Sequence, residues 1–491
     1  MSVWIILNEQ NIWWRDRSKI DEKDHVRKWL ESKVRWYSKI MEMRETPGIV
    51  YMIKGPRQVG KSTHILLKIK ELLEQKDPFN ILYVHCEAFS SRKELDQALR
   101  EYLRSAKGLV WIFIDEATHI KDWYVSIKYF RDIGLLKNAV VIVTGSSSLD
   151  LARASNYLSG RRGEDIEENL DRVLLPMSFK EALVSALGSK QVRKFIAKNI
   201  NQKTLYEVLS GRVPEELRRL LAFWEEISSA FNTYLITGGY LLAIDKYLKE
   251  QKIDTGIYRL FITLVRRDLE NYGFDPVKVD QVIGRLIETL TEPVDYGTLK
   301  TGTDIQSSTR LSDYLSALQG SFIINQVPYI NPSNKRIILR KRRKYYFRDP
   351  FIYHAFRAWT LGLEPFEASI HVIKDPTTRG MIVENIICEY LIRHVVVANK
   401  RLLVDPQSHM AYIGYWRTEK GEVDFIMKLR NKYVPLEVKY REKIDSGRLR
   451  ALIKTVQILR SKGIVVSKKP EDLREEQYYL VIPAPIFLTM F

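Results

Sequence analysis

Short apolar runs alternate with a segment of helical periodicity along the first third of the chain. Runs typical of buried parallel strands occupy residues 48–54, 81–86, 110–114 and 139–144. Residues 64–73, between the first two runs, have the apolar spacing of a helix. Strands that alternate with helices predict an α/β domain with a parallel sheet, whose ligand site lies at the carboxyl ends of the strands.

The middle of the chain has the periodicity of three helices followed by two strands. Helical spacing covers residues 279–290 and 307–319, and a short helix is expected between them at 296–301. Residues 322–330 and 336–339 have the pattern of strands on either side of a turn cluster, Asn-Pro-Ser-Asn. Three helices and a hairpin predict a winged helix.

The C-terminal part returns to an α/β pattern. A helix is expected over residues 380–395, and three strand patterns follow it at 411–416, 422–427 and 433–440. A second helix is expected over 446–459, with strands at 463–467 and 478–482. The order helix, three strands, helix and strand is the skeleton of PD-(D/E)XK nucleases.

Composition indicates an ordinary globular protein with several domains. The chain has 491 residues, 45% of them hydrophobic and 28% charged, and this length corresponds to roughly three or four domains. No apolar run reaches the ~18 residues that a membrane span needs, so no membrane association is expected. Cys86 and Cys388 are the only cysteines and cannot build a disulfide framework, which favours a reducing, cytoplasmic location.

The charge balance changes the picture more than the composition does. A formal net charge of +18 favours a polyanionic partner, with DNA or another nucleic acid first and an anionic membrane second. A generally basic proteome or tuning for solubility is the alternative explanation.

A phosphate-binding loop is the clearest chemical motif. Residues 55–62 read GPRQVGKS, directly after the first strand and directly before the helix, which is the context that this motif requires. Gly55 and Gly60 let backbone N–H groups surround the phosphates. We expect Lys61 to reach the β- and γ-phosphates of ATP and the Ser62 hydroxyl to ligate Mg²⁺. The predicted nucleotide-binding residues are Gly55, Pro56, Arg57, Gln58, Val59, Gly60, Lys61, Ser62, Thr63, Asp115 and Ser146.

Two acids and a serine follow later strands of the same predicted sheet. The third strand ends in Asp115-Glu116, where Asp115 is expected to hold Mg²⁺ and Glu116 to orient or deprotonate the attacking water. The alternative is a pair of acids that caps the next helix. Ser146 follows the fourth strand and is the expected sensor of the γ-phosphate. The Trp13-Trp14 pair is interpreted as core in preference to adenine stacking.

Several motifs together resemble those of a known family. The segments are NIWW from Asn11, GPRQVGKS, FIDE, TGSSS, LSGR, LPMSFKEAL and TGGY. With them, the chain resembles prokaryotic AAA+ ATPases, related to the ORC/STAND branch, that carry winged-helix and PD-(D/E)XK nuclease-like C-terminal domains. The resemblance implies a helical lid after residue 195, with Gly238-Gly239 near the nucleotide. Leu241-Leu242 stand where the related branch often has a proline.

The resemblance also raises the question of an arginine finger. Arg161 or Arg162 is the candidate, in cis or from a neighbouring subunit of a homo-oligomer, with Arg161 preferred. A surface arginine pair beside a turn is the alternative.

A basic cluster follows the predicted hairpin strands. It contains eight side chains, namely Lys335, Arg336, Arg340, Lys341, Arg342, Arg343, Lys344 and Arg348. Such a cluster on a wing is suited to DNA phosphates, and the amino end of the third helix, residues 307–310, is the groove-facing candidate. A solvated basic face is the alternative.

The C-terminal strands carry a candidate nuclease site. A hairpin that turns between Arg430 and Asn431 places Asp424 opposite Glu437, where two facing carboxylates repel each other unless a cation lies between them. Glu437 and Lys439 share a face because strand side chains alternate. We therefore expect Asp424, Glu437 and Glu384 to bind Mg²⁺ and Lys439 to orient the attacking water. The alternative is an ordinary solvent face in which Glu422 and Lys439 form a salt bridge.

These inferences combine into one organisation and three functional hypotheses. The expected domains are a P-loop AAA+ core over 1–195, a helical lid over 196–270, a winged helix over 271–370 and a restriction-endonuclease-like α/β domain over 371–491. The first hypothesis is an ATP-hydrolysing protein that acts on DNA with a Mg²⁺-dependent nuclease. The alternatives are a DNA-binding ATPase with a silent nuclease fold and a STAND-like signalling switch with a protein partner.

Overall fold

The computed structural model describes residues 3–163, 170–398, 408–418, 421–429 and 432–491. The chain forms two compact units, Met1–Leu175 and Pro176–Phe491. The division falls after residue 175, before the predicted domain boundary at residue 195. Residues 176–195 therefore lie in the second unit. The predicted lid, winged-helix region and nuclease-like region also lie there together.

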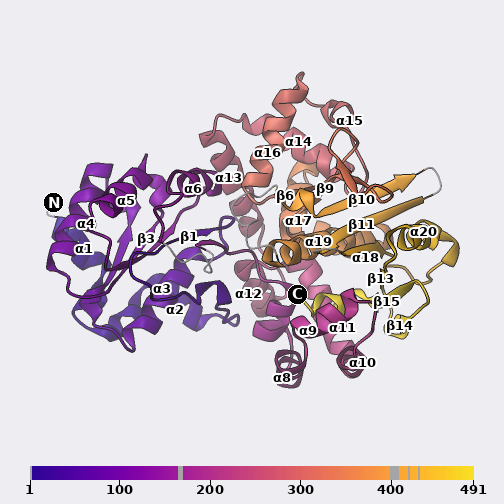
Figure 1. Ribbon diagram of the computed structural model, residues 1–491, viewed down its shortest axis with the longest axis horizontal. Coiled ribbons are helices and arrows are strands. Elements are labelled where there is room, and N and C mark those ends of the chain that lie inside the picture. The colour runs from indigo at the N-terminus through magenta and orange to yellow at the C-terminus, as the bar shows by residue number, and fades with distance from the viewer. Residues whose placement is uncertain (1–2, 164–169, 399–407, 419–420, 430–431) are drawn as a thin grey trace. The chain divides into compact units, whose positions relative to one another are not determined.

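A parallel sheet of five strands forms the centre of the first unit (Figure 1). Its strands are β1 (Val50–Lys54), β2 (Ile81–His85), β3 (Val110–Asp115), β4 (Ala139–Thr144) and β5 (Asp171–Val173), in the order β2-β3-β4-β1-β5. The first four strands match the predicted apolar runs to within two residues at each end. The loop of residues 55–60 leaves the carboxyl end of β1, which lies between β4 and β5, as expected for a ligand site in an α/β sheet.

Helices cover both faces of this sheet (Figure 1). They are α1 (Val3–Gln10), α2 (Asp24–Glu31), α3 (Lys61–Leu73), α4 (Arg92–Ser105), α5 (Trp123–Asp132) and α6 (Ser148–Tyr157). Side chains of α1, α4, α5 and α6 form one core cluster with alternate residues of the strands. Trp13 is fully buried, and the indole N–H groups of Trp13 and Trp14 donate to the carbonyl of Ile81, so the interpretation of this pair as core is confirmed.

The second unit begins with helices. These are α7 (Phe179–Ala182), α8 (Lys190–Asn199), α9 (Gln202–Leu209), α10 (Glu215–Leu220), α11 (Trp224–Thr237), α12 (Leu241–Glu250) and α13 (Thr255–Asn271). Gly238 and Gly239, between α11 and α12, pack against their own unit. The amide of Gly239 donates to the Asp349 carboxylate at 2.8 Å, and a Cβ at this glycine would lie 2.0 Å from the Met177 carbonyl oxygen. Close packing therefore accounts for the glycines without a nucleotide.

The predicted three helices and hairpin are present. The helices are α14 (Pro276–Glu288), α15 (Tyr296–Lys300) and α16 (Ser308–Gly320), and the hairpin is the antiparallel pair β7 (Tyr329–Asn331) and β8 (Arg336–Ile338). The single strand predicted over 322–330 is wrong. It is divided into β6 (Ile324–Val327) and β7 at Pro328, which has no N–H to donate to a ladder. Strand β6 pairs with β9 (Lys344–Phe347), a strand that the sequence pattern did not reveal.

The C-terminal sheet has eight strands, in the order β14-β15-β13-β12-β11-β10-β7-β8. Its further strands are β10 (Ile413–Thr418), β11 (Gly421–Leu429), β12 (Lys432–Val438), β13 (Gly463–Ser467), β14 (Arg474–Glu475) and β15 (Tyr479–Pro483). The remaining helices are α17 (Pro350–Leu361), α18 (Pro365–Lys374), α19 (Pro376–Ala398), α20 (Arg450–Leu459) and α21 (Ala484–Leu488). Tyr329 of β7 pairs with Tyr415 of β10, so the hairpin of the middle region extends this sheet.

The predicted order of helix, three strands, helix and strand is found as α19, β10, β11, β12, α20 and β13. Strand β11 is antiparallel to both β10 and β12, whereas β13 is parallel to β12 and β7 is parallel to β10. The register of β11 and β12, with Phe425 opposite Leu436 and Leu429 opposite Lys432, is the one that the predicted turn requires. The turn itself, at residues 430–431, lies outside the described residues.

Candidate functional sites

The loop between β1 and α3 has the backbone of a phosphate-binding loop. Gly55 and Gly60 have φ angles of 149° and 92°, and a Cβ at Gly55 would lie 2.0 Å from the Leu174 carbonyl oxygen. Both positions therefore require glycine. Helix α3 begins at Lys61, whose ammonium donates to the carbonyls of Gly55 and Pro56 at 3.0 and 2.9 Å.

A cavity of 230 Å³ lies beside this loop and holds most of the predicted nucleotide-binding residues. The predicted residues that line it are Arg57, Gln58, Gly60, Lys61, Ser62, Thr63, Glu116 and Ser146. Gly55, Pro56, Val59 and Asp115 are not among the lining residues, and Val59 is buried. The sequence analysis missed His25, His85 and Glu87, which line the same cavity.

One of the missed residues could have been predicted from its position at the end of a strand. His85 is the last residue of β2 and pairs with Asp115 of β3, so it follows from the strand order. His25 comes from α2, a helix that the sequence analysis did not identify, and its Nδ1 lies 3.4 Å from Thr63 Oγ1. Burial lowers the pKa of His25 below its usual value, although the nearby Asp115 carboxylate opposes this shift.

Asp115 and Glu116 take different places at the end of β3. Asp115 is fully buried and accepts hydrogen bonds from the Tyr83 hydroxyl at 2.9 Å and from the Thr144 hydroxyl. Glu116 lines the cavity, has a left-handed backbone with φ of 51° and accepts from the Ser146 amide at 2.9 Å. Asp115, the predicted Mg²⁺ ligand, is thus buried, whereas Glu116, predicted to orient or deprotonate the attacking water, lines the cavity.

Neither candidate arginine finger lines this cavity. Arg162 is buried, forms an ion pair with Asp171 at 2.7 Å and donates to the Val50 carbonyl, so it joins β1 to the edge strand β5. Arg161 forms an exposed ion pair with Asp132 at 3.1 Å. Asp132 ends α5, which leads to the amino end of β4, whereas the loop lies at the carboxyl ends of the strands.

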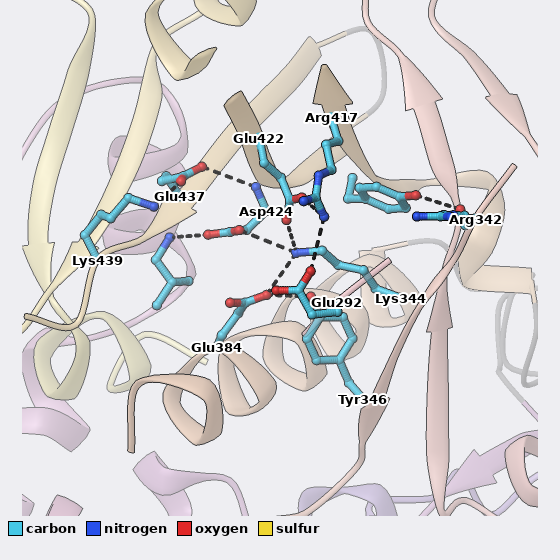
Figure 2. A network of polar contacts seen from close by, with 12 residues as sticks. Glu292, Arg342, Lys344, Tyr346, Glu384, Arg417, Glu422, Asp424, Glu437 and Lys439 are labelled. Atoms are coloured by element: carbon cyan, nitrogen blue, oxygen red, sulfur yellow. Dashed lines mark hydrogen bonds and ion pairs between the residues drawn. The ribbon is translucent and has the colours of Figure 1, made fainter. Parts of the chain in front are cut away.

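A second cavity, of 1060 Å³, lies in the second unit and brings the predicted nuclease residues together (Figure 2). Glu384 of α19, Asp424 of β11, and Glu437 and Lys439 at the end of β12 all line it. The Asp424 amide donates to Glu437 at 3.3 Å, and the Val438 amide donates to Asp424 at 2.8 Å. The two carboxylates therefore lie side by side, as the register predicted.

Lys439 pairs with its strand neighbour Glu437 and not with Glu422. The Glu422–Lys439 salt bridge, which the alternative of an ordinary solvent face requires, is therefore not formed. Strand β12 ends at Val438, and the Lys439 amide already bonds to the Val466 carbonyl at 2.8 Å. Glu422 instead contacts Lys344 and Arg417.

Lys344 is the member of this site that the sequence analysis missed. Its ammonium lies among three carboxylates, 3.2 Å from Glu384, 3.5 Å from Asp424 and in contact with Glu422 (Figure 2). Its side chain is 1% exposed. The Tyr346 hydroxyl, on the same face of β9, donates to Glu384 at 2.7 Å. No motif reveals this contact, because β9 is far from β11 in sequence.

The basic cluster is correspondingly smaller than predicted. Lys344 and Arg348 are both buried, and Arg348 binds Glu389 through two hydrogen bonds of 3.0 and 3.2 Å. Both residues bind carboxylates of the second unit instead of facing solvent. Lys335, Arg336, Arg340, Lys341 and Arg342 are exposed and Arg343 is half-buried.

Burial and mutual repulsion perturb the acids of this pocket. Burial and the neighbouring Asp424 carboxylate raise the pKa of Glu384 to about 7 and raise the pKa of Glu437 well above its usual value. Burial alone would lower the pKa of Lys344, but the surrounding carboxylates outweigh it and hold that pKa well above the usual value for lysine. The lysine therefore remains charged in a crowded acidic pocket.

Magnesium fits this pocket through two carboxylates and not through three. Within the described part of the chain, no group of three or more His, Cys, Asp or Glu side chains is arranged to hold a metal ion, so the predicted trio does not form. Glu384 is bound by Lys344 and Tyr346. Asp424 and Glu437 still fit magnesium, which prefers oxygen ligands and keeps several waters. In the first unit, Ser62 lines the nucleotide cavity and Asp115 lies buried behind it.

The loop, the helix that starts at Lys61 and the Asp-Glu pair on the sheet define a P-loop ATPase. A family model described as AAA domain matches residues 48–183. The chain therefore carries a P-loop ATPase domain of the AAA type, which binds ATP.

The rest of the chain matches models without a described function. A domain of unknown function, DUF8612, matches residues 228–366, and another, DUF4143, matches residues 379–487. No curated protein matches the sequence. None of the helices in the described residues is both long and apolar enough to cross a membrane.

Solved structures match this chain only at low identity and low TM-score. The Walker-type ATPase PABY2304 of Pyrococcus abyssi is 16% identical, with a TM-score of 0.36 over 69% of this chain and 96% of its own. The Aeropyrum pernix ORC1 protein in complex with DNA is 12% identical, with a TM-score of 0.30 over 66% and 88%. A Thermotoga maritima RuvB mutant is 14% identical, with a TM-score of 0.26 over 63% and 89%. These values support no conclusion about partners or substrates.

Proposed function

We propose that this protein couples ATP hydrolysis to an action on DNA and that its second unit is a Mg²⁺-dependent nuclease of the PD-(D/E)XK type. The observation that supports the nuclease is the 1060 Å³ pocket, in which Asp424, Glu437 and Lys439 meet. Basic side chains line the same pocket, among them Lys374, Arg379, Arg417, Arg441 and Lys468. An acidic centre with basic surroundings suits a phosphodiester backbone, because the basic groups bind phosphates while the acids hold a cation.

At the nucleotide site, each residue has a separate task. Lys61, now bonded to loop carbonyls, turns to the β- and γ-phosphates. Ser62 and Asp115 hold the magnesium ion that accompanies ATP. Glu116 orients the attacking water, and the Ser146 amide that now holds its carboxylate positions it for that role. Arg161 remains available to a neighbouring subunit of a homo-oligomer.

The region of α14, α15 and α16 with the β7–β8 hairpin is proposed to be a winged helix that binds DNA. Ser307 caps α16, whose first turn is exposed and contains Arg310. The six basic residues of the cluster that are not buried follow or flank the hairpin, from Lys335 to Arg343. Their phosphate contacts account for affinity, and nothing in this surface selects a base sequence.

At the nuclease site, Asp424 and Glu437 hold magnesium, and the ion, when bound, lowers the pKa of a water and polarises the phosphodiester. Lys439, next to Glu437, orients the water or stabilises the developing charge on the phosphate. The water oxygen forms a bond to phosphorus as one ester P–O bond breaks, which leaves a phosphate monoester and a hydroxyl. Arg417, half exposed beside Glu422, lies where it can bind the DNA backbone.

The test is magnesium-dependent cleavage of duplex, single-stranded and branched DNA, with and without ATP. Wild type is compared with Asp424→Ala, Lys439→Ala and the matched surface control Lys428→Ala, which lies on β11 outside the pocket lining. We expect cleavage that is lost in the first two variants and kept in the control. Cleavage that survives in Asp424→Ala would contradict the assignment.

A silent nuclease fold is the second candidate, and Lys344 favours it. An ammonium already binds Glu384, Glu422 and Asp424, and it reduces the pocket's need for a metal ion. In this case the pocket binds DNA through its basic side chains without cutting it. DNA binding and ATP hydrolysis without cleavage of any substrate would support this function.

A further inference from the structure

Lys344 enters the carboxylate pocket from outside the sheet that builds it. It is the first residue of β9, which pairs with β6 in a separate two-stranded sheet, whereas Asp424 and Glu437 lie on the eight-stranded sheet and Glu384 on α19. Figure 2 shows its ammonium among the carboxylates of Glu384, Glu422 and Asp424. The lysine thus supplies a positive charge from another part of the fold.

Carboxylates outnumber the cations that contact them at the centre of the pocket. Four carboxylates meet there, namely Glu384, Glu422, Asp424 and Glu437, and they form ion pairs with Lys344, Lys439 and Arg417. Arg417 is half exposed and also binds Glu292. Lys344, with 1% of its side chain exposed, is therefore the most deeply buried of these three cations.

Lys344 and a divalent cation draw on the same oxygen atoms. Asp424 turns one carboxylate oxygen to Lys344 and the other to the Val438 amide. A metal ion that binds Asp424 must therefore share this carboxylate with the lysine. Lys344 and Tyr346 both donate to one carboxylate oxygen of Glu384, Oε1. Two cations at one carboxylate repel each other, and the repulsion is strong where water is excluded.

We infer that Lys344 is a tethered cation that competes with a divalent cation for Asp424 and Glu384, and that it thereby limits the affinity of the pocket for metal. This inference rests on the proposed nuclease site. Lys344 is a positioning residue: it holds Glu384 away from the metal and leaves Asp424 and Glu437 as the ligand pair. Its removal frees a third carboxylate for the ion.

The experiment is a titration of the full chain with Mn²⁺, followed by electron paramagnetic resonance, without nucleotide. All proteins compared, including the reference called wild type below, carry Lys61→Ala, so that the nucleotide site contributes no bound ATP or metal. Lys344→Met keeps the length of the side chain and removes its charge, and Lys428→Met makes the same change of net charge on β11 outside the pocket lining. Lys344→Arg keeps the positive charge.

We expect Lys344→Met to bind Mn²⁺ about tenfold more tightly than wild type, since one adjacent charge is removed from a partly enclosed site. Lys428→Met and Lys344→Arg should bind like wild type, and adding Asp424→Ala to Lys344→Met should abolish the gain. Equal affinity in wild type and Lys344→Met would overturn the inference and leave the nuclease proposal standing. Binding by Lys344→Met alone would support the inference and sink the nuclease proposal for the wild type. No binding by either protein would overturn both.

A second measurement needs no substitution at Lys344 and covers the case in which Lys344→Met does not fold. Competition is reciprocal, so Mn²⁺ must loosen the lysine as the lysine weakens Mn²⁺. We expect saturating Mn²⁺ to increase the acylation of Lys344 by an N-hydroxysuccinimide ester, measured by mass spectrometry relative to Lys428. Asp424→Ala should show no increase. Unchanged labelling of Lys344 in a wild type that binds Mn²⁺ would overturn the inference.

Discussion

Replacing Arg348 by alanine tests whether the basic cluster was correctly divided into buried and exposed members. Arg348 is 9% exposed and binds both carboxylate oxygens of Glu389, at 3.0 and 3.2 Å. Glu389 is itself 2% exposed and also accepts from Arg393 at 2.8 Å and from Asn325 at 2.6 Å. The substitution leaves a buried carboxylate with one cation where it had two.

The expected cost follows from this geometry. Breaking a buried ion pair by removing one partner costs about 3–5 kcal/mol, and since Arg393 and Asn325 remain, we expect about 3 kcal/mol of lost unfolding free energy in the second unit. The matched control is Arg340→Ala. Arg340 is exposed, and a surface substitution costs about 0.5 kcal/mol or less.

Thermal unfolding with and without ATP is the assay. Nucleotide stabilises the unit that binds it, so the transition that ATP does not shift reports on the second unit. DNA affinity as a function of salt completes the comparison. Arg340→Ala should reduce the salt slope by about 0.9, and Arg348→Ala should not change it at temperatures where the protein is folded. If Arg348→Ala is no less stable than Arg340→Ala, the ion pair of Arg348 with Glu389 does not stabilise the second unit.

Three further predictions concern other parts of the chain. Lys61→Ala should abolish ATP binding, while Glu116→Gln should bind ATP and not turn it over; equal hydrolysis rates in wild type and Glu116→Gln would contradict the role of that acid. Burial raises the pKa of Asp349 from 3.8 to about 7, so its contribution to stability is complete below the unfolded pKa and is lost as pH rises through about 7. Asp349→Asn, which can still cap α17, should therefore flatten the stability profile between pH 4 and 7 by about 3 kcal/mol, as measured by urea unfolding at several pH values. Gly239→Ala places a Cβ 2.0 Å from the Met177 carbonyl oxygen and should lower the melting temperature of the second unit, whereas Gly256→Ala, with no atom within 4 Å of the new Cβ, should leave it unchanged or raise it.

Much of this protein could be predicted from local sequence because the relevant interactions are local. The loop from Gly55 to Ser62 is one continuous segment, and its glycines, strand and helix follow one another directly. The β11–β12 register could be predicted because only two residues separate the two strands in the sequence and side chains alternate along both. The three helices and the hairpin of the middle region also follow from periodicity within each segment.

Contacts between distant segments could not be predicted in this way. Lys344 and Arg348 stand among exposed arginines and lysines in the sequence, and the pairing of β9 with β6 turns both residues inward. Arg162 binds Asp171 inside the sheet edge because β5 pairs with β1, which no motif signals. The pairing of β7 with β10 joins two predicted domains through one sheet.

Features that depend on neighbouring residues could therefore be predicted from the sequence, whereas features that depend on contacts between distant segments could not. Backbone geometry, alternation and turn length act over a few residues, and they determine the nucleotide loop, the order of the strands along the chain and the placement of Asp424 beside Glu437. The environment of a charge depends on which strands pair across the fold. Tertiary structure alone decided that Lys344 lies among the carboxylates as a buried cation and that Glu384 binds this lysine.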